Sequence, residues 1–201
     1  MTPEEINSLD WQKQGGLLPT VVQDESNGQV LMLGYMNRDA LDATLDTGHV
    51  TFWSRSKERL WTKGETSGNA LALVRIETDC DRDSLLVIAR PNGPTCHLGR
   101  ASCFAEAPSN FLAELDALIR ERELDRPPGS YTTTLFDSGT KGIAQKVGEE
   151  GVEAALAAVA ENDSALLGEA ADLIYHLTVL LRSRGLSLQA VVEVLRDRHR
   201  T

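Results

Sequence analysis

The spacing of apolar residues changes once along this chain, between Ala105 and Ser109. Before this point, short apolar runs alternate with turns rich in Gly, Asn and Pro, whereas after it apolar residues recur at intervals of three and four. Strand-length runs predict a sheet and the longer period predicts helices. A chain of 201 residues can also bury two cores. The sequence therefore predicts two domains, a β-rich α+β domain over residues 1–107 and an all-α helical bundle over residues 108–201.

The N-terminal half is predicted to contain a hairpin, two short helices and further strands. Ser26-Asn27-Gly28 separates two apolar runs, and Asn-Gly in that position is the strongest short hairpin signal. Asn37 is a suitable N-cap for a helix that ends at Gly48. A short first helix that includes Ile6, Leu9 and Trp11 is expected within residues 1–20, ended by Gly15-Gly16 and Pro19. The expected strands are 21–23, 30–33, 50–53, 60–62, 70–76 and 84–89.

Four helices are predicted in the C-terminal half. The first starts at Pro108-Ser109 and ends at Pro127-Pro128-Gly129-Ser130, because proline interrupts a helix. Asn162-Asp163, Gly185 and the N-cap residue Ser187 separate the others. Their expected ranges are 140–161, 164–184 and 188–200. The helix at 164–184 is apolar nearly all round, so it is expected to be largely buried.

The chief polar residues on this apolar helix, Glu169, Asp172 and His176, form one stripe. A buried carboxylate is costly unless it is neutralised, and Lys146 on the preceding helix could do this. That helix also carries three acids within one turn, Glu149, Glu150 and Glu153. Three glutamates alone are typical of a solvated face, but acids on two adjacent helices are better explained by divalent cations between them. Hard oxygen ligands favour Mg²⁺, which commonly binds substrate phosphates.

All three cysteines lie between Asp79 and Cys103, together with three alternating aspartates. The two sets are Cys80, Cys96 and Cys103, and Asp79, Asp81 and Asp83. Thiolates among carboxylates are poor core packing, whereas soft and hard ligands suit two different cations. On an extended segment the aspartates would project from one side and Cys80 from the other. Three buried cysteines without metal are the plain alternative. On zinc, three thiolates would leave a fourth position for water, which is the catalytic arrangement.

Several residues near these sets are candidates for acid–base chemistry or substrate binding. His97 follows Cys96 and is either a packing residue or a general acid/base, and we favour the second. The other histidines, His49, His176 and His199, have no ligand spacing and are expected to be structural or on the surface. Hydroxyls, glycines and cations crowd residues 52–69, a composition that suits a sugar-phosphate pocket but also solvated hairpin loops. The candidate substrate contacts there are Ser54, Arg55, Ser56, Trp61, Lys63, Glu65, Thr66 and Ser67.

Charge and composition exclude several classes of partner. The formal net charge is −10 and neither half is basic, so a nucleic-acid polymer is a poor candidate. No apolar run approaches the ~18 residues of a membrane span, and the N-terminus lacks the pattern of a signal peptide. Three cysteines do not make a disulfide framework. A cytoplasmic protein with reduced thiols and no membrane partner is therefore expected.

The acidic motifs of the C-terminal half resemble a known family. Glu149-Glu150-x-x-Glu153 followed by Glu169-x-x-Asp172 is similar to the all-α nucleotide pyrophosphohydrolases. Ser130-Tyr131-Thr132 and Lys141-Gly142-x-x-x-Lys146-Val147-Gly148 resemble one member, phosphoribosyl-ATP pyrophosphohydrolase of histidine biosynthesis. The resemblance implies a Mg²⁺-bound triphosphate and release of pyrophosphate, with phosphate contacts from Lys141 and Lys146. The implied Mg²⁺ ligands are Glu149, Glu150, Glu153, Glu169 and Asp172, and the first three are the catalytic candidates.

The N-terminal half resembles phosphoribosyl-AMP cyclohydrolase from about Leu17 to Cys103. The motifs that carry the resemblance are Leu33-Gly34-Tyr35-Met36-Asn37, Asp79-Cys80-Asp81-Arg82-Asp83 and Gly93-Pro94-Thr95-Cys96-His97. It implies Zn²⁺ on Cys80, Cys96 and Cys103, and Mg²⁺ on Asp79, Asp81 and Asp83. It also implies a homodimer in which the zinc site is shared between subunits.

The two resemblances fall on consecutive steps of one pathway, in the order of the fused bifunctional enzyme of histidine biosynthesis. They imply Mg²⁺-dependent hydrolysis of phosphoribosyl-ATP to phosphoribosyl-AMP and pyrophosphate, then Zn²⁺-dependent opening of the adenine ring between N1 and C6. Two alternatives stay open. One is a house-cleaning nucleoside triphosphate pyrophosphatase with a metal-stabilised accessory domain, and the other is a zinc-stapled nucleotide-binding regulator without turnover.

Overall fold

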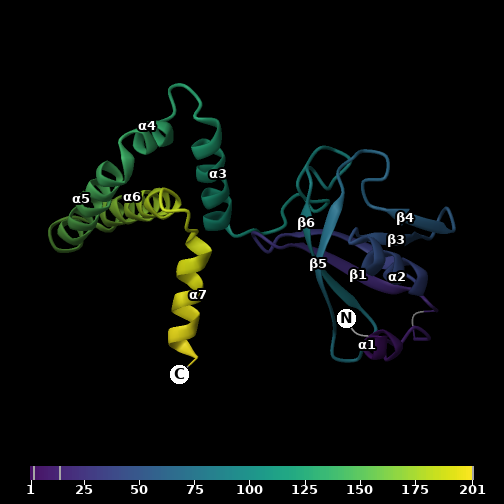
Figure 1. Cartoon of the computed structure of the whole chain (residues 1–201). Helices are drawn as coiled ribbons and strands as arrows, with labels where there is room; N and C mark the ends of the chain where they lie inside the picture. Colours follow the sequence, from purple (N-terminus) through teal and green to yellow (C-terminus); the bar gives the residue numbers. More distant parts are fainter. Residues whose placement is uncertain (2, 14, 201) are drawn as a thin grey trace. The chain divides into compact units, whose positions relative to one another are not determined.

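The computed structural model describes residues 1, 3–13 and 15–200. The chain forms two compact units, Met1–Asn110 and Phe111–Thr201. The first contains all the named strands and two helices, and the second contains helices alone (Figure 1). The expected fold class, a β-rich α+β domain followed by an all-α domain, is confirmed.

The core of the N-terminal unit is a four-stranded mixed sheet with the strand order β2-β1-β6-β5. Neighbouring strands are antiparallel except β1 and β6, which run parallel. Strands β3 and β4 form a separate antiparallel pair, which lies between β2 and β5 in the sequence. The strands are β1 (Leu18–Asp24), β2 (Val30–Met36), β3 (Thr51–Ser54), β4 (Arg59–Thr62), β5 (Leu71–Thr78) and β6 (Leu85–Pro91).

Local signals predicted the β1–β2 hairpin and the helix α2 (Arg38–Thr47) correctly. The Asn37 side chain accepts a hydrogen bond from the backbone N–H of Ala40, which caps the first turn of α2. Gly48 ends the helix in the left-handed conformation, with φ of 69°, and its N–H donates to the Thr44 carbonyl. The core beneath contains fully buried side chains from both sheets and from α2, among them Leu18, Val22, Leu41, Phe52 and Val87.

The N-terminal helix differs from the prediction. Helix α1 spans only Pro3–Asn7, so Leu9 and Trp11 follow it instead of extending it. Ile6 and Leu9 are nevertheless buried against the sheet core. Pro19 was expected to end the helical region, but it lies inside β1. The apolar residues Ile6 and Leu9 therefore do pack on the core, but their spacing did not predict the length of the helix.

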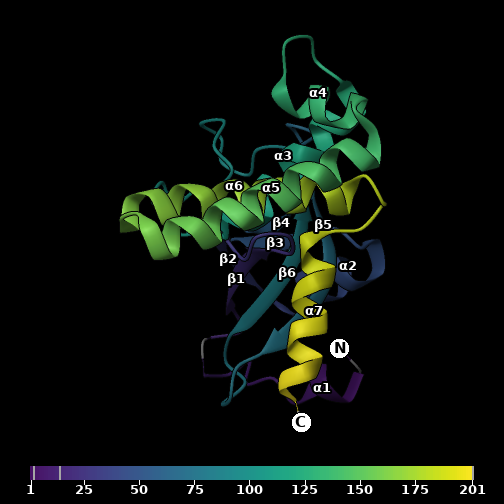
Figure 2. The same cartoon turned by 90° about the vertical axis from the view of Figure 1, so that its left-hand side faces the viewer.

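The described residues of the C-terminal unit form five helices, of which α5 and α6 run side by side in opposite directions (Figures 1 and 2). The buried core is small and contains Ile119, Leu135, Phe136, Ile143 and Val179. An ion pair between the buried Asp116 and the partly buried Arg182 joins α3 to α6. The helices are α3 (Phe111–Asp125), α4 (Tyr131–Asp137), α5 (Gly139–Ala160), α6 (Asp163–Arg182) and α7 (Leu188–His199).

Two helix predictions in this unit were wrong. The first helix was expected from Pro108-Ser109 but begins at Phe111. Helix α4 was missed, because seven residues are too few to show a clear apolar period. Its cap is nevertheless visible in the sequence, since the Ser130 side chain accepts a hydrogen bond from the Thr133 N–H. The predicted N-cap of α7, Ser187, is confirmed, and Asn162, which was expected only to separate two helices, caps α6.

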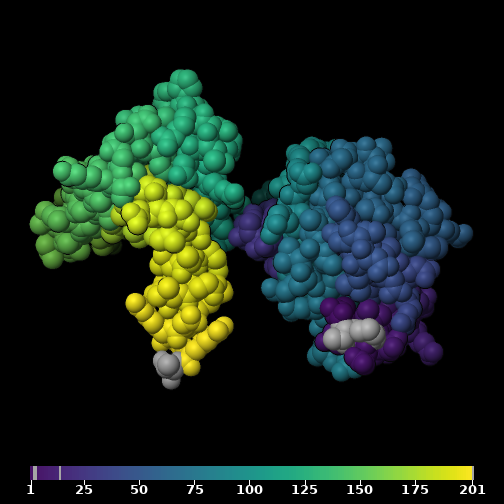
Figure 3. All heavy atoms as spheres, viewed as in Figure 1, coloured from purple at the N-terminus to yellow at the C-terminus, as the bar shows by residue number. Residues whose placement is uncertain are grey.

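The expectation that α6 is largely buried was also wrong. Leu167 is 69% exposed and Ile174 is 39% exposed. Helix α5 also exposes three apolar side chains, Val152, Leu156 and Val159. Among the described residues none of α7 is buried, and this helix projects from the rest of its unit (yellow in Figure 3). The sequence shows which side chains are apolar, but it does not show whether the same chain covers them.

Helix α6 also departs from the expectation about membranes. Within the described part of the chain, one helical segment, Asp163–Ser183, has the length and the apolar composition needed to cross a membrane. The same segment carries Glu169, Asp172 and His176, and α6 packs along α5. A single helix of this kind is weak evidence for a membrane span, because core helices pass the same test.

Candidate active sites

The N-terminal unit contains a cavity of about 500 Å³ beside the loops that follow β4 and β6. Four of the expected substrate contacts line it, namely Trp61, Lys63, Thr66 and Ser67. His97 and two of the three cysteines are also on its wall. The complete lining is Met32, Trp61, Lys63, Gly64, Thr66, Ser67, Asn69, Pro94, Thr95, Cys96, His97, Gly99 and Cys103. A cavity of this size with a few polar groups suits a small-molecule ligand.

The other expected substrate contacts, Ser54, Arg55, Ser56 and Glu65, do not line the cavity. The Arg55 guanidinium lies over the ring of Tyr35, 3.8 Å from its centroid. Glu65 accepts a hydrogen bond of 2.6 Å from Arg59, and this ion pair lowers the pKa of Glu65. Ser54, Arg55 and Ser56 lie at the end of β3 and in the turn after it, and Glu65 follows β4. All four are close to the cavity residues in sequence without lining the cavity.

Cys96 and Cys103 lie together on the cavity wall with different electrostatic surroundings. The backbone N–H of Leu98 donates to the Cys96 sulfur at 3.5 Å and, with a longer contact from Arg100, lowers the pKa of the Cys96 thiol. Burial, followed by the adjacent Cys96, raises the pKa of Cys103. Cys96 is therefore the more readily ionised of two neighbouring soft donors, a combination that fits a zinc ion.

Cys80 is not part of this pair. It is exposed in the turn between β5 and β6, whereas Cys96 and Cys103 follow the other end of β6. A strand rises about 3.3 Å per residue, so seven-residue β6 separates the two places by roughly 20 Å. Ligands on one zinc ion lie about 2.3 Å from it. One chain therefore cannot place all three thiolates on one ion in this fold.

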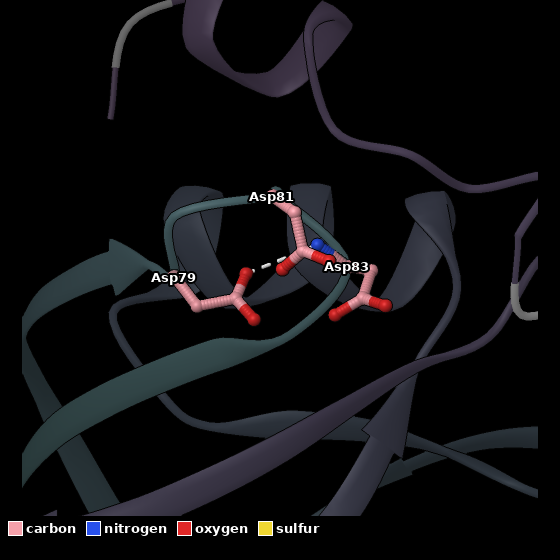
Figure 4. Close-up of side chains that lie close together, drawn as sticks. All are labelled: Asp79, Asp81 and Asp83. Carbon is pink, nitrogen blue, oxygen red and sulfur yellow. Dashed lines mark hydrogen bonds between the residues drawn. The ribbon is translucent and has the colours of Figure 1, made fainter.

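The aspartates next to Cys80 do converge, although not in the way the sequence suggested. Residues 79–84 form a turn instead of an extended segment, and Arg82 in it has a left-handed φ of 62°. Asp79 accepts hydrogen bonds from the backbone N–H groups of Asp83 and Ser84 and from the Ser84 hydroxyl. The turn gathers the carboxylates of Asp79, Asp81 and Asp83, whose potential ligand atoms lie within 4.8 Å of one another (Figure 4).

The hydrogen bonds to Asp79 have a consequence for stability at low pH. The Ser84 hydroxyl, followed by two backbone N–H groups, lowers the pKa of Asp79 from 3.8 to about 2. A carboxylate with a lowered pKa stabilises the fold above its ordinary pKa, and the contribution is lost as the pH falls through the folded pKa. Thermal stability of the metal-free protein should therefore exceed that of Asp79→Ala at pH 5, and the difference should shrink between pH 4 and pH 2.

Tryptophan fluorescence can follow this change selectively, because all three tryptophans lie in the N-terminal unit. Asp46→Ala, which removes an exposed carboxylate from α2, is the matched control. A difference between wild type and Asp79→Ala that stays constant from pH 5 to pH 2 would contradict this role of Asp79.

The second acidic group lies between α5 and α6. The potential ligand atoms of Glu150, Glu169 and Asp172 lie within 4.8 Å of one another, and Glu150 is buried. Burial, followed by the charges of Glu153, Glu150 and Asp172, raises the pKa of Glu169. A carboxyl group whose pKa is raised by neighbouring carboxylates marks an excess of negative charge in one place. This donor set fits a hard divalent cation such as Mg²⁺.

The remaining predicted residues surround this group. Lys146 Nζ lies 2.9 Å from Glu149 Oε2 and 3.0 Å from Glu150 Oε1, so it pairs with glutamates of its own helix and not, as the sequence had suggested, with the α6 carboxylates. Lys146, followed by Gln145, lowers the pKa of Glu149, which is not one of the three converging carboxylates. Glu153 is exposed but close enough to Glu169 to influence its pKa. Lys141 is exposed in the first turn of α5.

His176, which was expected to be structural or on the surface, is buried beside the acidic group. Its Nδ1 lies 2.8 Å from the Asp172 carbonyl oxygen and 3.6 Å from Glu150 Oε1, both of which can only accept. Nδ1 therefore carries the proton, and in the neutral ring Nε2 accepts a hydrogen bond of 2.9 Å from the Tyr131 hydroxyl. The signal was present in the sequence, since His176 continues the polar stripe of α6.

Comparison with known protein families matches the two units separately. Residues 32–105 match the family of phosphoribosyl-AMP cyclohydrolase, and residues 112–199 match that of phosphoribosyl-ATP pyrophosphohydrolase. The cyclohydrolase match includes the cavity and the Asp79 turn, and the pyrophosphohydrolase match includes both acidic helices. Both resemblances noted in the sequence are thereby confirmed.

Relatives of this chain carry both units over nearly their whole length. The histidine biosynthesis bifunctional protein HisIE of Xanthomonas campestris is 66% identical over 195 residues, which cover 97% of this chain and 95% of that protein. HisIE of Xylella fastidiosa strain Temecula1 is 65% identical over the same shares. HisIE of Escherichia coli is 56% identical over 201 residues, with 99% of each chain covered. This chain is therefore a bifunctional hydrolase that belongs to the family of histidine biosynthesis bifunctional proteins, with a cyclohydrolase unit followed by a pyrophosphohydrolase unit.

Proposed function

We propose that the helical unit hydrolyses phosphoribosyl-ATP to phosphoribosyl-AMP and pyrophosphate, and that the N-terminal unit then opens the adenine ring of phosphoribosyl-AMP between N1 and C6. The observation that carries this proposal is the presence of two donor sets with different chemistry in two separate units. Carboxylates converge between α5 and α6, whereas two thiols face a cavity in the N-terminal unit. Phosphoanhydride hydrolysis needs hard cations, and ring hydrolysis at neutral pH suits zinc.

In the helical unit, Glu150, Glu169 and Asp172 would hold Mg²⁺, with Glu149 and Glu153 at the edge of the group. Mg²⁺ bound there would neutralise charge on the triphosphate oxygens. Lys146, already cationic beside Glu149 and Glu150, is placed to contact a phosphate that approaches this group. We propose Glu149, Glu150 and Glu153 as the candidates that orient the attacking water and accept its proton. Lys141 stays a candidate phosphate contact.

His176 would act in this reaction as a positioning residue. It is nearly surrounded by protein and lies within 3.6 Å of Glu150, so it limits where that carboxylate can move. Through Nε2 it also fixes the hydroxyl of Tyr131, whose side chain is half exposed at the start of α4. Both contacts hold groups in place without requiring His176 to touch the substrate.

In the N-terminal unit, Cys96 and Cys103 of one subunit and Cys80 of a second subunit would hold Zn²⁺. The roughly 20 Å between the two ends of β6 supports this division of ligands. Zinc bound there would supply a nucleophilic water at neutral pH. Water is added across the N1–C6 bond, so a proton must reach N1, and His97 on the cavity wall is our candidate donor. Trp61, Lys63, Thr66 and Ser67 would bind the nucleotide, and Asp79, Asp81 and Asp83 would bind Mg²⁺.

A homodimer is part of the proposal. A composite zinc site requires two copies of the N-terminal unit. The uncovered apolar side chains of α5 and α6, and the absence of buried residues among those described in α7, give the helical unit surfaces that a second copy could also cover. We further propose a cytoplasmic location, which is supported by thiols that must stay reduced to bind zinc.

One assay tests the proposed function directly. Purified protein with Mg²⁺ and Zn²⁺ should convert phosphoribosyl-ATP with release of pyrophosphate followed by ring opening, which changes the ultraviolet absorption of the purine. A zinc-selective chelator should stop ring opening while pyrophosphate release continues. Faster turnover of ordinary or damaged nucleoside triphosphates than of phosphoribosyl-ATP would favour a house-cleaning pyrophosphatase. Tight nucleotide binding without either product would favour a regulator.

A further inference from the structure

Lys13 occupies part of the acidic turn between β5 and β6. Its Nζ lies 2.5 Å from Asp81 Oδ2 and 2.7 Å from Asp83 Oδ2. A lysine side chain is a cation at neutral pH, so its ammonium forms an ion pair with each of these carboxylates. The third aspartate, Asp79, is instead engaged by Ser84 and by backbone N–H groups of the turn. The ammonium therefore faces the two carboxylates that accept fewer hydrogen bonds within the turn than Asp79 does.

The position of Lys13 is also fixed by its backbone. The N–H of Asp10 donates to the carbonyl of Arg82 at 2.8 Å, which attaches the N-terminal segment to the turn. The Asp10 side chain accepts a hydrogen bond of 3.1 Å from the N–H of Lys13. Lys13 thus reaches the aspartates from a segment held against the same turn. This arrangement distinguishes it from a surface lysine that meets a carboxylate by chance.

Lys13 and a divalent cation cannot both contact the carboxylates of Asp81 and Asp83 at the same time. Mg²⁺ binds carboxylate oxygens at about 2.0–2.1 Å. An ion at that distance from the two Oδ2 atoms would lie within contact distance of the Lys13 ammonium, and the two positive charges would repel each other. Binding of the ion therefore requires the ammonium to leave.

We propose that Lys13 is a tethered counter-cation that occupies the Asp81–Asp83 side of the acidic turn in the metal-free protein and competes with the divalent cation there. Lys13 thereby sets the apparent affinity of this site for metal, and loading of the site releases the lysine side chain to solvent. This inference rests on the proposed Mg²⁺ site at Asp79, Asp81 and Asp83.

Metal binding to the full-length chain tests the proposal. The Glu150→Gln/Asp172→Asn background removes the carboxylates of the helical group, and Mn²⁺, a hard cation detected by its EPR signal, serves as the probe. Lys13→Gln in this background should lower the Kd for Mn²⁺ roughly three- to tenfold, the size expected when two partly exposed ion pairs no longer compete. Lys57→Gln, which changes the net charge equally in the β3–β4 turn, should leave the Kd unchanged.

Amine labelling of the wild-type chain gives a second measurement without a variant at Lys13. Mn²⁺ should increase the labelling of Lys13, detected by mass spectrometry, while the labelling of Lys57 in the same sample stays constant. Equal Mn²⁺ affinity of Lys13→Gln and its parent, with labelling of Lys13 unaffected by Mn²⁺, would overturn the role of Lys13 and leave the metal site standing. If neither protein binds Mn²⁺ at the turn, the metal assignment and the inference both fail.

Discussion

The variant Glu150→Gln/Asp172→Asn should release pyrophosphate from phosphoribosyl-ATP at least about 10³-fold more slowly than the wild type. It removes two of the three carboxylates whose ligand atoms lie within 4.8 Å of one another between α5 and α6. The amides have nearly the same shape, so the packing of the two helices is retained. They cannot supply the negative charge that a hard cation requires.

Stability distinguishes this loss from a folding defect. The charges of Glu150 and Asp172 contribute to the raised pKa of Glu169, so removing them relieves repulsion in the metal-free form. The far-ultraviolet circular dichroism of the variant should therefore match the wild type, and its metal-free melting temperature should be equal or higher. The paired control Glu121→Gln/Asp125→Asn changes two exposed carboxylates of α3 and should retain pyrophosphate release within about twofold.

The same variant tests whether the two sites act separately. Ring opening of supplied phosphoribosyl-AMP should stay within about twofold of the wild-type rate, because the cavity with Cys96 and His97 lies in the other unit. Loss of both activities would argue against independent sites. Normal pyrophosphate release would exclude Glu150 and Asp172 from the catalytic metal site.

The parts of the fold that the sequence predicted well are those controlled by neighbouring residues. Asn37 and Gly48 define α2 through a side-chain cap and a left-handed glycine, and both signals act within one turn of helix. Helix α4 was missed because its seven residues are too few to show a clear apolar period. The exposed apolar face of α6 was not predictable for a different reason. Periodicity reports an apolar surface, whereas its burial depends on what other chain segments or subunits cover it.

The same distinction applies to the candidate sites. Glu169 and Asp172 are three residues apart on one helix, so their convergence follows from helical geometry, and Glu150 joins them because α5 and α6 are adjacent. The three aspartates also converge, although through a turn stabilised by Asp79 instead of an extended strand. Cys80 and Cys96 are different, because the seven residues of β6 hold them apart. The strand expected at 84–89 already lies between these two cysteines in the sequence.

The separation of Cys80 from the other cysteines leads to the second prediction. Cys80→Ser and Cys96→Ser homodimers should each lose nearly all ring opening and bound zinc. Heterodimers of the two variants, co-expressed with different affinity tags and purified through both, should recover about half of the wild-type activity and half of its zinc. In such a heterodimer one composite site lacks both mutated thiols, while the other combines the intact Cys80 of one subunit with the intact Cys96 and Cys103 of its partner.

A second heterodimer, of Cys96→Ser with Cys103→Ala, is the matched control. Both changes affect the cavity side of the site, so each of the two composite sites lacks one thiolate and no activity should return. If zinc were bound within one subunit, neither heterodimer would recover activity, since every subunit would carry a damaged site. If the Cys80→Ser homodimer keeps zinc and ring opening, Cys80 is not a ligand. Recovery in the first heterodimer and not in the second therefore requires ligands from opposite ends of β6 to meet across a subunit interface.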